Sequence, residues 1–140
     1  MSVRNILDEL NDDVEIEHTD NIQMSFTGPF FEVDSAVTFY RHNKFVLIYL
    51  SQFYSTGYYV SEIVSKETVD DLYLPRNIEN IIPSFALIWN GDKKIGLLYV
   101  GTDKKIHISG DTVVGSSFDI PPSSDPVVGV ERGCVLSYFV

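Results

Sequence analysis

Alternation of apolar and polar residues with a period of two is the feature that most limits what this chain can fold into. Ile22, Met24 and Phe26 alternate with polar neighbours, and similar runs recur along most of the 140 residues. Successive side chains of a β-strand point to opposite faces, so this period is typical of strands with one buried face. The sequence therefore predicts a mostly β protein.

Turn-forming residues divide these runs into successive strands. Breaks are expected at Thr19-Asp20-Asn21, Gly28-Pro29, Asp34-Ser35 and the segment 41–44. Asn90-Gly91 is the strongest hairpin signal, because a type I′ turn needs positive φ at both central positions. Short connections between neighbouring strands favour an antiparallel meander. We expect either a curled sheet approaching a barrel or a two-layer sandwich.

Two segments have helical features. Near the N-terminus, apolar residues recur with helical spacing at Val3, Ile6, Leu7 and Leu10. A short internal helix is expected over residues 66–73, with Ser65 as its N-cap and Glu67, Asp70 and Asp71 near its start. The predicted fold class is therefore α+β, mostly β: an antiparallel meander sheet with an N-terminal helix and one short internal helix. Its length suits a single domain spanning residues 1–140.

The cysteine count and the lengths of the apolar segments indicate where in the cell the protein is located. Cys134 is the single cysteine, which excludes an intrachain disulfide and a zinc site built from several thiolates. The N-terminal segment lacks the continuous apolar run of a signal peptide, and no stretch approaches the ~20 apolar residues of a membrane helix. We expect a cytoplasmic protein with no membrane partner.

The negative charge is concentrated at the start of the chain. The net charge is −10, and the first 35 residues carry nine carboxylates against Arg4 alone. Because phosphate backbones require the opposite sign, direct binding of nucleic acid is not expected. A basic protein partner, attracted by this field, is expected instead. The candidate residues of this segment are Asp12, Asp13, Glu15, Glu17 and Asp20.

A metal site is the alternative interpretation of the same acids. Asp13, Glu15 and Glu17 share one strand face if His18 and its apolar neighbours face the core, and a row of carboxylates can hold a hard cation. However, the sequence lacks the spaced Asp/Asn and Gly residues of a calcium loop. The expectation is therefore a solvated or partner-binding face, with no metal.

Adjacent aromatic residues are the second candidate feature. The pairs are Phe30-Phe31, Phe39-Tyr40, Phe53-Tyr54, Tyr58-Tyr59 and Tyr138-Phe139. Strand neighbours point to opposite faces, so each pair places one ring on either side of the sheet. Either both faces are covered or an aromatic patch stays available to a partner. Tyr54, Tyr58 and Tyr59, around the turn at Gly57, are the expected aromatic anchors.

The chain has no recognisable catalytic motif. It contains no nucleophile elbow, phosphate loop, zinc-protease motif or dinucleotide glycine pattern. Cys134 lies in an apolar run, where a buried and inert thiol is expected. We therefore predict no catalytic residue, no cofactor and no enzyme.

The predicted function is a small acidic protein-binding module. Its composition is analogous to that of inhibitors and immunity-type proteins that dock a basic partner. Two alternatives remain open: a β-barrel that binds a small molecule, and a recognition or assembly domain of a longer protein.

Overall fold

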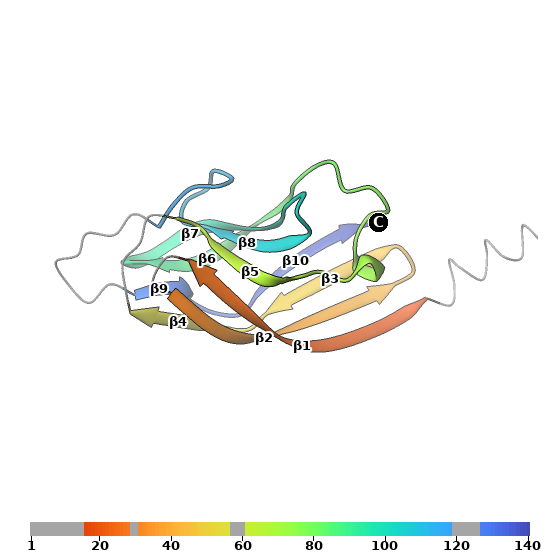
Figure 1. Cartoon of the computed structure of the whole chain (residues 1–140), viewed down its shortest axis with the longest axis horizontal. Coiled ribbons are helices and arrows are strands. Elements are labelled where there is room, and N and C mark those ends of the chain that lie inside the picture. Colours follow the sequence, from red (N-terminus) through yellow and green to blue (C-terminus); the bar gives the residue numbers. More distant parts are fainter. Residues whose placement is uncertain (1–15, 29–30, 57–60, 119–126) are drawn as a thin grey trace, which may run out of the picture.

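The computed structural model describes residues 16–28, 31–56, 61–118 and 127–140. These described residues form β-strands and one short 3₁₀ turn, η1 (Figure 1). The elements are β1 (Glu17–Gly28), β2 (Phe31–His42), β3 (Phe45–Leu50), β4 (Phe53–Thr56), β5 (Ile63–Thr68), η1 (Asp71–Tyr73), β6 (Ile82–Asn90), β7 (Asp92–Val100), β8 (Lys105–Ser109), β9 (Val127–Val130) and β10 (Cys134–Phe139). The domain is β-rich.

All strands join one antiparallel sheet in the order β10-β3-β2-β1-β5-β8-β7-β6-β9-β4. The strand β3 runs into β4 across Ser51 and Gln52, and β9 runs into β10 across residues 131–133. The two end strands of the order, β10 and β4, are thus continuations of β9 and β3, which each have neighbours on both sides. In addition, β3 pairs with β10, and β9 pairs with β4. The sheet therefore curls back on itself into a half-barrel (Figure 1).

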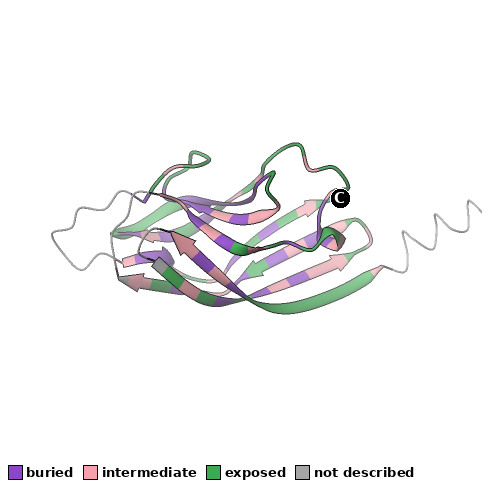
Figure 2. Ribbon diagram, viewed as in Figure 1, coloured by how far each residue is buried: buried purple, intermediate pink, exposed green. Residues whose placement is uncertain are grey.

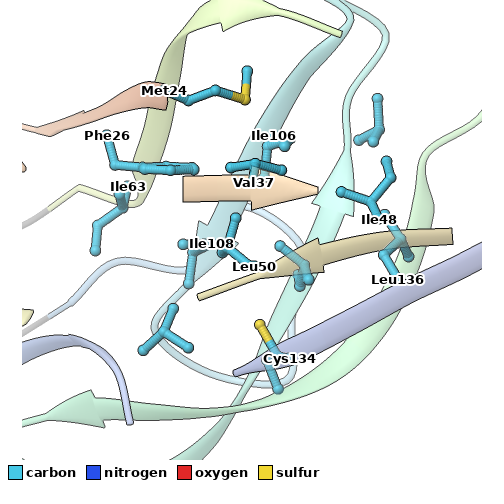
Figure 3. Close-up of a cluster of buried hydrophobic side chains, with 14 of the residues drawn as sticks. Met24, Phe26, Val37, Ile48, Leu50, Ile63, Ile106, Ile108, Cys134 and Leu136 are labelled. Atoms are coloured by element: carbon cyan, nitrogen blue, oxygen red, sulfur yellow. The ribbon is translucent and has the colours of Figure 1, made fainter. Parts of the chain in front are cut away.

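The core lies between the two halves of this curled sheet. The strands β10, β3, β2 and β1 contribute Leu136, Ile48, Val37 and Phe26, which are almost fully buried (Figure 3). The other half contributes residues such as Ile108. Buried and exposed positions alternate along the central strands (Figure 2), as the period of two requires. Large side chains thus fill the interior.

The predicted α+β class is wrong, because the described residues contain no α-helix. Residues 66–68, where the internal helix was expected to start, belong to strand β5 instead. Ser65, the expected N-cap, is buried in that strand, where its hydroxyl donates to the Glu67 carbonyl and accepts from the Ile106 amide. Only η1 is helical among the described residues, and Asp70 caps it by accepting a bond from the Leu72 amide. The predicted helix at residues 3–10 lies outside the described residues.

Two of the expected turns, at residues 19–21 and at residues 34–35, do not exist. Strands β1 and β2 pair without interruption from Glu17 opposite His42 to Gly28 opposite Phe31. A residue expected to turn the chain instead bonds across the ladder: the Thr38 hydroxyl donates to the Asn21 side chain at 2.7 Å. The hairpin between β6 and β7 is confirmed, and it turns on Gly91 with a φ of 79°. Asn90 keeps a negative φ, so the expected pair of positive angles is absent.

Candidate functional site

The outer face of β10, β3, β2 and β1 displays apolar side chains in regular rows. Residues directly opposite each other in a ladder point to the same side. Phe139, Phe45, His42 and Glu17 form one such row, on the side of the sheet away from the core. The apolar members of this face, called here the outer patch, are Tyr40, Phe45, Leu47, Tyr49, Val135 and Phe139.

The outer patch is open to solvent. Phe139 is 76% exposed, Val135 41% and Tyr49 40%. The rings of Phe45 and Phe139 meet edge to face, with their centroids 5.7 Å apart. Beside them lies a shallow hollow of about 400 Å³, lined by the β2–β3 turn and these two rings. A contiguous apolar area of this kind typically marks an interaction surface.

Carboxylates lie on the same outer face of β1 and β2, with Glu17 beside the outer patch and Glu32 and Asp34 farther along the ladder, beyond the end of β3. Glu17, Glu32 and Asp34 lie on the same face by register. Glu32 forms an exposed ion pair with Lys66 at 2.6 Å, and Asp34 accepts a bond from the Ser25 hydroxyl. Glu17 is exposed, with no bonded partner among the described residues. The face is therefore apolar in the centre and acidic along one side.

The predicted acidic cluster is described only in part. Asp12, Asp13 and Glu15 lie outside the described residues. Glu17 and Asp20 are three positions apart on β1, so their side chains leave opposite faces of the strand. Asp20 accepts a hydrogen bond from the Tyr73 hydroxyl rather than pointing freely to solvent. His18, expected in the core, is exposed.

Among the predicted aromatic anchors, the structure describes Tyr54. It is 58% exposed on β4, while Tyr58 and Tyr59 lie outside the described residues. In Figure 1, β4 lies at the opposite end of the molecule from the first residues of β1. The structure therefore does not bring Tyr54 together with Glu17. Sequence reasoning noted Phe139 in an aromatic pair, but it missed the other outward apolar members of β3 and β10, which are Phe45, Leu47, Tyr49 and Val135.

A second set of exposed apolar residues lies on the outer side of β6 and β7. Phe85 is 70% exposed, Ile95 46% and Leu87 36%. The neighbouring Lys93 packs over the Trp89 ring at 5.5 Å and also pairs with Glu131. Lys93 beside this set thus has partners within the chain, whereas Glu17 beside the outer patch has none among the residues that the structure describes.

Two of the described nucleophilic side chains, Cys134 and Ser109, are buried. Cys134 is 8% exposed, and burial raises the pKa of its thiol to about 12, so the reactive thiolate is scarce near neutral pH. The Ser109 hydroxyl donates to Glu62 and is fully buried. The described residues hold no group of three or more His, Cys, Asp or Glu side chains placed to bind a metal.

One titratable cluster, called here the His107 cluster, joins β7, β8 and the residue before β5. His107 Nδ1 lies 2.6 Å from Glu62 and its Nε2 lies 2.9 Å from Asp103. The Tyr99 hydroxyl donates to the second Glu62 oxygen at 2.6 Å, and the Tyr99 ring stacks on the imidazole with centroids 4.7 Å apart. An imidazole that bonds carboxylates through both nitrogens is best satisfied as imidazolium.

Opposing effects set the pKa values in the His107 cluster. Burial alone lowers the pKa of His107, but the bonds to Glu62 and Asp103 outweigh it, so this pKa lies above its ordinary value. Burial raises the pKa of Glu62, but the bonds from His107, Tyr99 and Ser109 outweigh it, leaving this pKa lowered. Asp103 follows the same pattern: burial raises its pKa, but the bonds from His107 and the Lys105 amide outweigh that effect and leave the pKa lowered. The cluster acts as a structural ion network.

Fold and surface together define the class: an all-β domain, over its described residues, built on a curled antiparallel sheet with an exposed apolar face. No family model matches the chain, and no curated protein matches it in sequence. Among solved structures, it is similar to the reovirus attachment protein sigma1, crystallised in complex with alpha-2,3-sialyllactose. The TM-score is 0.54 at 12% identity, over 89% of this chain and 65% of that one. The chain therefore spans less than two thirds of that protein, and the likeness is one of fold.

No helix in the part of the chain that the structure describes is both long and apolar enough to cross a membrane.

Proposed function

We propose that this domain is a non-catalytic recognition module that docks a protein partner through the outer patch. The observation that carries the proposal is the exposed face of β3 and β10, where Phe139, Tyr49 and Val135 stand in solvent. Aromatic side chains of this kind bury a large area when a partner covers them, and they dominate the cores of interfaces. Docking would remove that apolar area from water.

The acidic border indicates the chemistry of the partner. Glu17 lies in the same row as Phe45 and Phe139, so it would sit at the rim of the interface. A partner with an apolar contact region and a basic rim complements this face, because unlike charges at a rim speed association. The proposed role is thus that of a binding or inhibitory module with Glu17 at the rim of its interface.

The fold of the similar protein is compatible with such a role. That protein is named as an attachment protein, so a chain of this general fold serves recognition there. The same task, on a different partner, is what we propose for this domain, whether it acts alone or as a recognition domain of a longer protein. The alternative of a small-molecule-binding barrel has less support, because the core between the sheet halves is filled by buried side chains.

Replacing Phe139 by serine is expected to weaken partner binding about tenfold or more, because aromatic hot-spot residues contribute about 2 kcal/mol or more to binding. The wild-type domain would first be used to capture and identify partners from an extract of its source, and the affinity of the purified partner would then be measured with each variant.

Phe85→Ser is the matched control for this prediction. It removes an equally exposed aromatic ring, 70% against 76%, from the opposite half of the sheet. Binding by this variant should equal that of the wild type. If Phe139→Ser binds normally while Phe85→Ser loses affinity, docking uses the β6–β7 face and the proposal is wrong.

Glu17→Lys tests the charge of the partner. Reversing this charge should slow association several-fold at low ionic strength and change little in high salt, because a rim charge acts through long-range attraction. Stopped-flow association rates at two salt concentrations would measure it, with Glu79→Lys, an exposed residue away from the outer patch, as control. Equal slowing by both variants would mean that only the net charge matters.

A further inference from the structure

A basic pocket lies at the end of the molecule where η1 and the C-terminal residue meet the β2–β3 turn (Figure 1). Its volume is about 410 Å³. The lining residues are Arg41, Lys44, Asp71, Leu74, Pro75, Arg76 and Val140. Three of them are cations, in a chain with twice as many acidic as basic residues. Such a local excess of positive charge in an anionic protein needs a physical explanation.

Hydrogen bonds to the main chain hold the Arg41 side chain in place in the pocket. Register places it on the core-facing side of β2, level with Val46 of β3 and Tyr138 of β10, at the open end between the sheet halves. Its Nε donates to the Asn43 carbonyl at 2.6 Å and one terminal nitrogen donates to the Leu72 carbonyl at 2.7 Å. A guanidinium has five N–H donors, so three remain.

None of the three cations has a carboxylate partner among the described residues. Among the side chains of the lining, Asp71 carries the one carboxylate, and it pairs with Lys104 at 3.0 Å. Arg41 is half-buried, and a charge withdrawn from water without a counter-ion is unfavourable. Lys44 and Arg76 extend the positive surface to the exposed rim. The three groups together form a site that an anion would neutralise.

We propose that this pocket binds a small ligand through an oxyanion group, a carboxylate or a phosphate, held by Arg41, Lys44 and Arg76. The planar guanidinium groups match the geometry of such oxygens, and Lys44 adds a point charge. The apolar wall formed by Leu74, Pro75 and Val140 contacts the carbon skeleton of the ligand. This site is separate from the outer patch, so the domain has a small-ligand site in addition to its protein-docking face.

The test is titration of the isotope-labelled domain with two probes, inorganic phosphate and N-acetylneuraminate, a carboxylate sugar, at constant ionic strength. Saturable shifts of the backbone amide resonances of residues 41–44 and 71–76 are expected with at least one probe. The probe that saturates identifies which oxyanion the pocket prefers. Absence of saturable shifts with both probes up to about 10 mM, where a site with a Kd of about 1 mM would be mostly filled, overturns the proposal.

The variant for this test is the double substitution Lys44→Gln and Arg76→Gln. Both side chains are exposed, so the fold should persist, and affinity for the probe should fall at least tenfold because two charge-assisted bonds are lost. Lys94→Gln with Lys105→Gln is the matched control: neither lysine forms a direct ion pair in the described part of the chain, and both lie outside the pocket. Equal weakening by both pairs would show non-specific charge attraction and overturn the site.

Discussion

Phe26→Ala should lower the free energy of unfolding by about 3–5 kcal/mol, the usual loss when a buried phenylalanine is truncated. Phe26 on β1 is fully buried and stacks on Phe53 of β4, with centroids 4.8 Å apart and planes 17° apart. The pair connects β1, in one half of the curled sheet, with β4, the end strand of the other half. Truncation therefore leaves a cavity at the contact that holds the curl closed.

Equilibrium unfolding in denaturant, followed by fluorescence and circular dichroism, would measure this loss. Phe85→Ala is the control, because the same change at a 70% exposed ring should alter stability by less than about 0.5 kcal/mol. A loss below about 1 kcal/mol at Phe26 would mean that the two sheet halves do not depend on this stack.

Strand positions were predictable because their signal is local. The alternation at Ile22, Met24 and Phe26 predicted one buried face; the structure buries Met24 and Phe26 but leaves Ile22 41% exposed. The opposite-face argument for aromatic neighbours is also confirmed at two described pairs: Phe53 is buried while Tyr54 is exposed, and Phe39 is buried while Tyr40 is only half-buried. Periodicity determines which side of a strand a residue occupies.

The ends of strands were less predictable, because residues that favour turns can also form hydrogen bonds across a strand ladder. Asn21 and Asp34 favour turns locally, yet each bonds a hydroxyl on the neighbouring strand. Glu67 resembles an acid in the first turn of a helix, but its carboxylate accepts the Ser25 amide at 3.0 Å. Tertiary partners such as these override local propensity and cannot be read from one segment.

The sites depend on long-range pairing that the sequence does not contain locally. Register between β3 and β10 assembles Phe45 with Phe139, which are far apart in the chain. Glu62, Asp103 and His107 meet only when β5 and β8 pair. Sequence reasoning identified Glu17, which borders the outer patch, but it selected Tyr54, which lies at the other end of the molecule (Figure 1).

The pH dependence of stability should reveal the His107 cluster. The pKa of His107 is raised in the folded state, so its contribution is fully present below about pH 6.5 and is lost as pH rises through the folded-state value. The pKa values of Glu62 and Asp103 are lowered, so their contributions are present above about pH 4.5 and are lost as pH falls through the folded-state values. The stabilisation by the cluster is therefore greatest between about pH 4.5 and 6.5.

Glu62→Gln is expected to lower the free energy of unfolding by about 2–3 kcal/mol within that window, because it leaves a mostly buried imidazolium with Asp103 as its one charged partner among the described residues. The loss should shrink as pH rises through the raised folded-state pKa of His107, because the imidazole of the wild type then also becomes neutral. Denaturant unfolding between about pH 4 and 8 would measure both effects, and an NMR titration should show the pKa of His107 falling in the variant.

Glu79→Gln, at an exposed carboxylate outside the cluster, is the control and should leave the profile unchanged. A loss that is the same at every pH would mean that Glu62 acts through its bonds to Tyr99 and Ser109 rather than through the charge on His107.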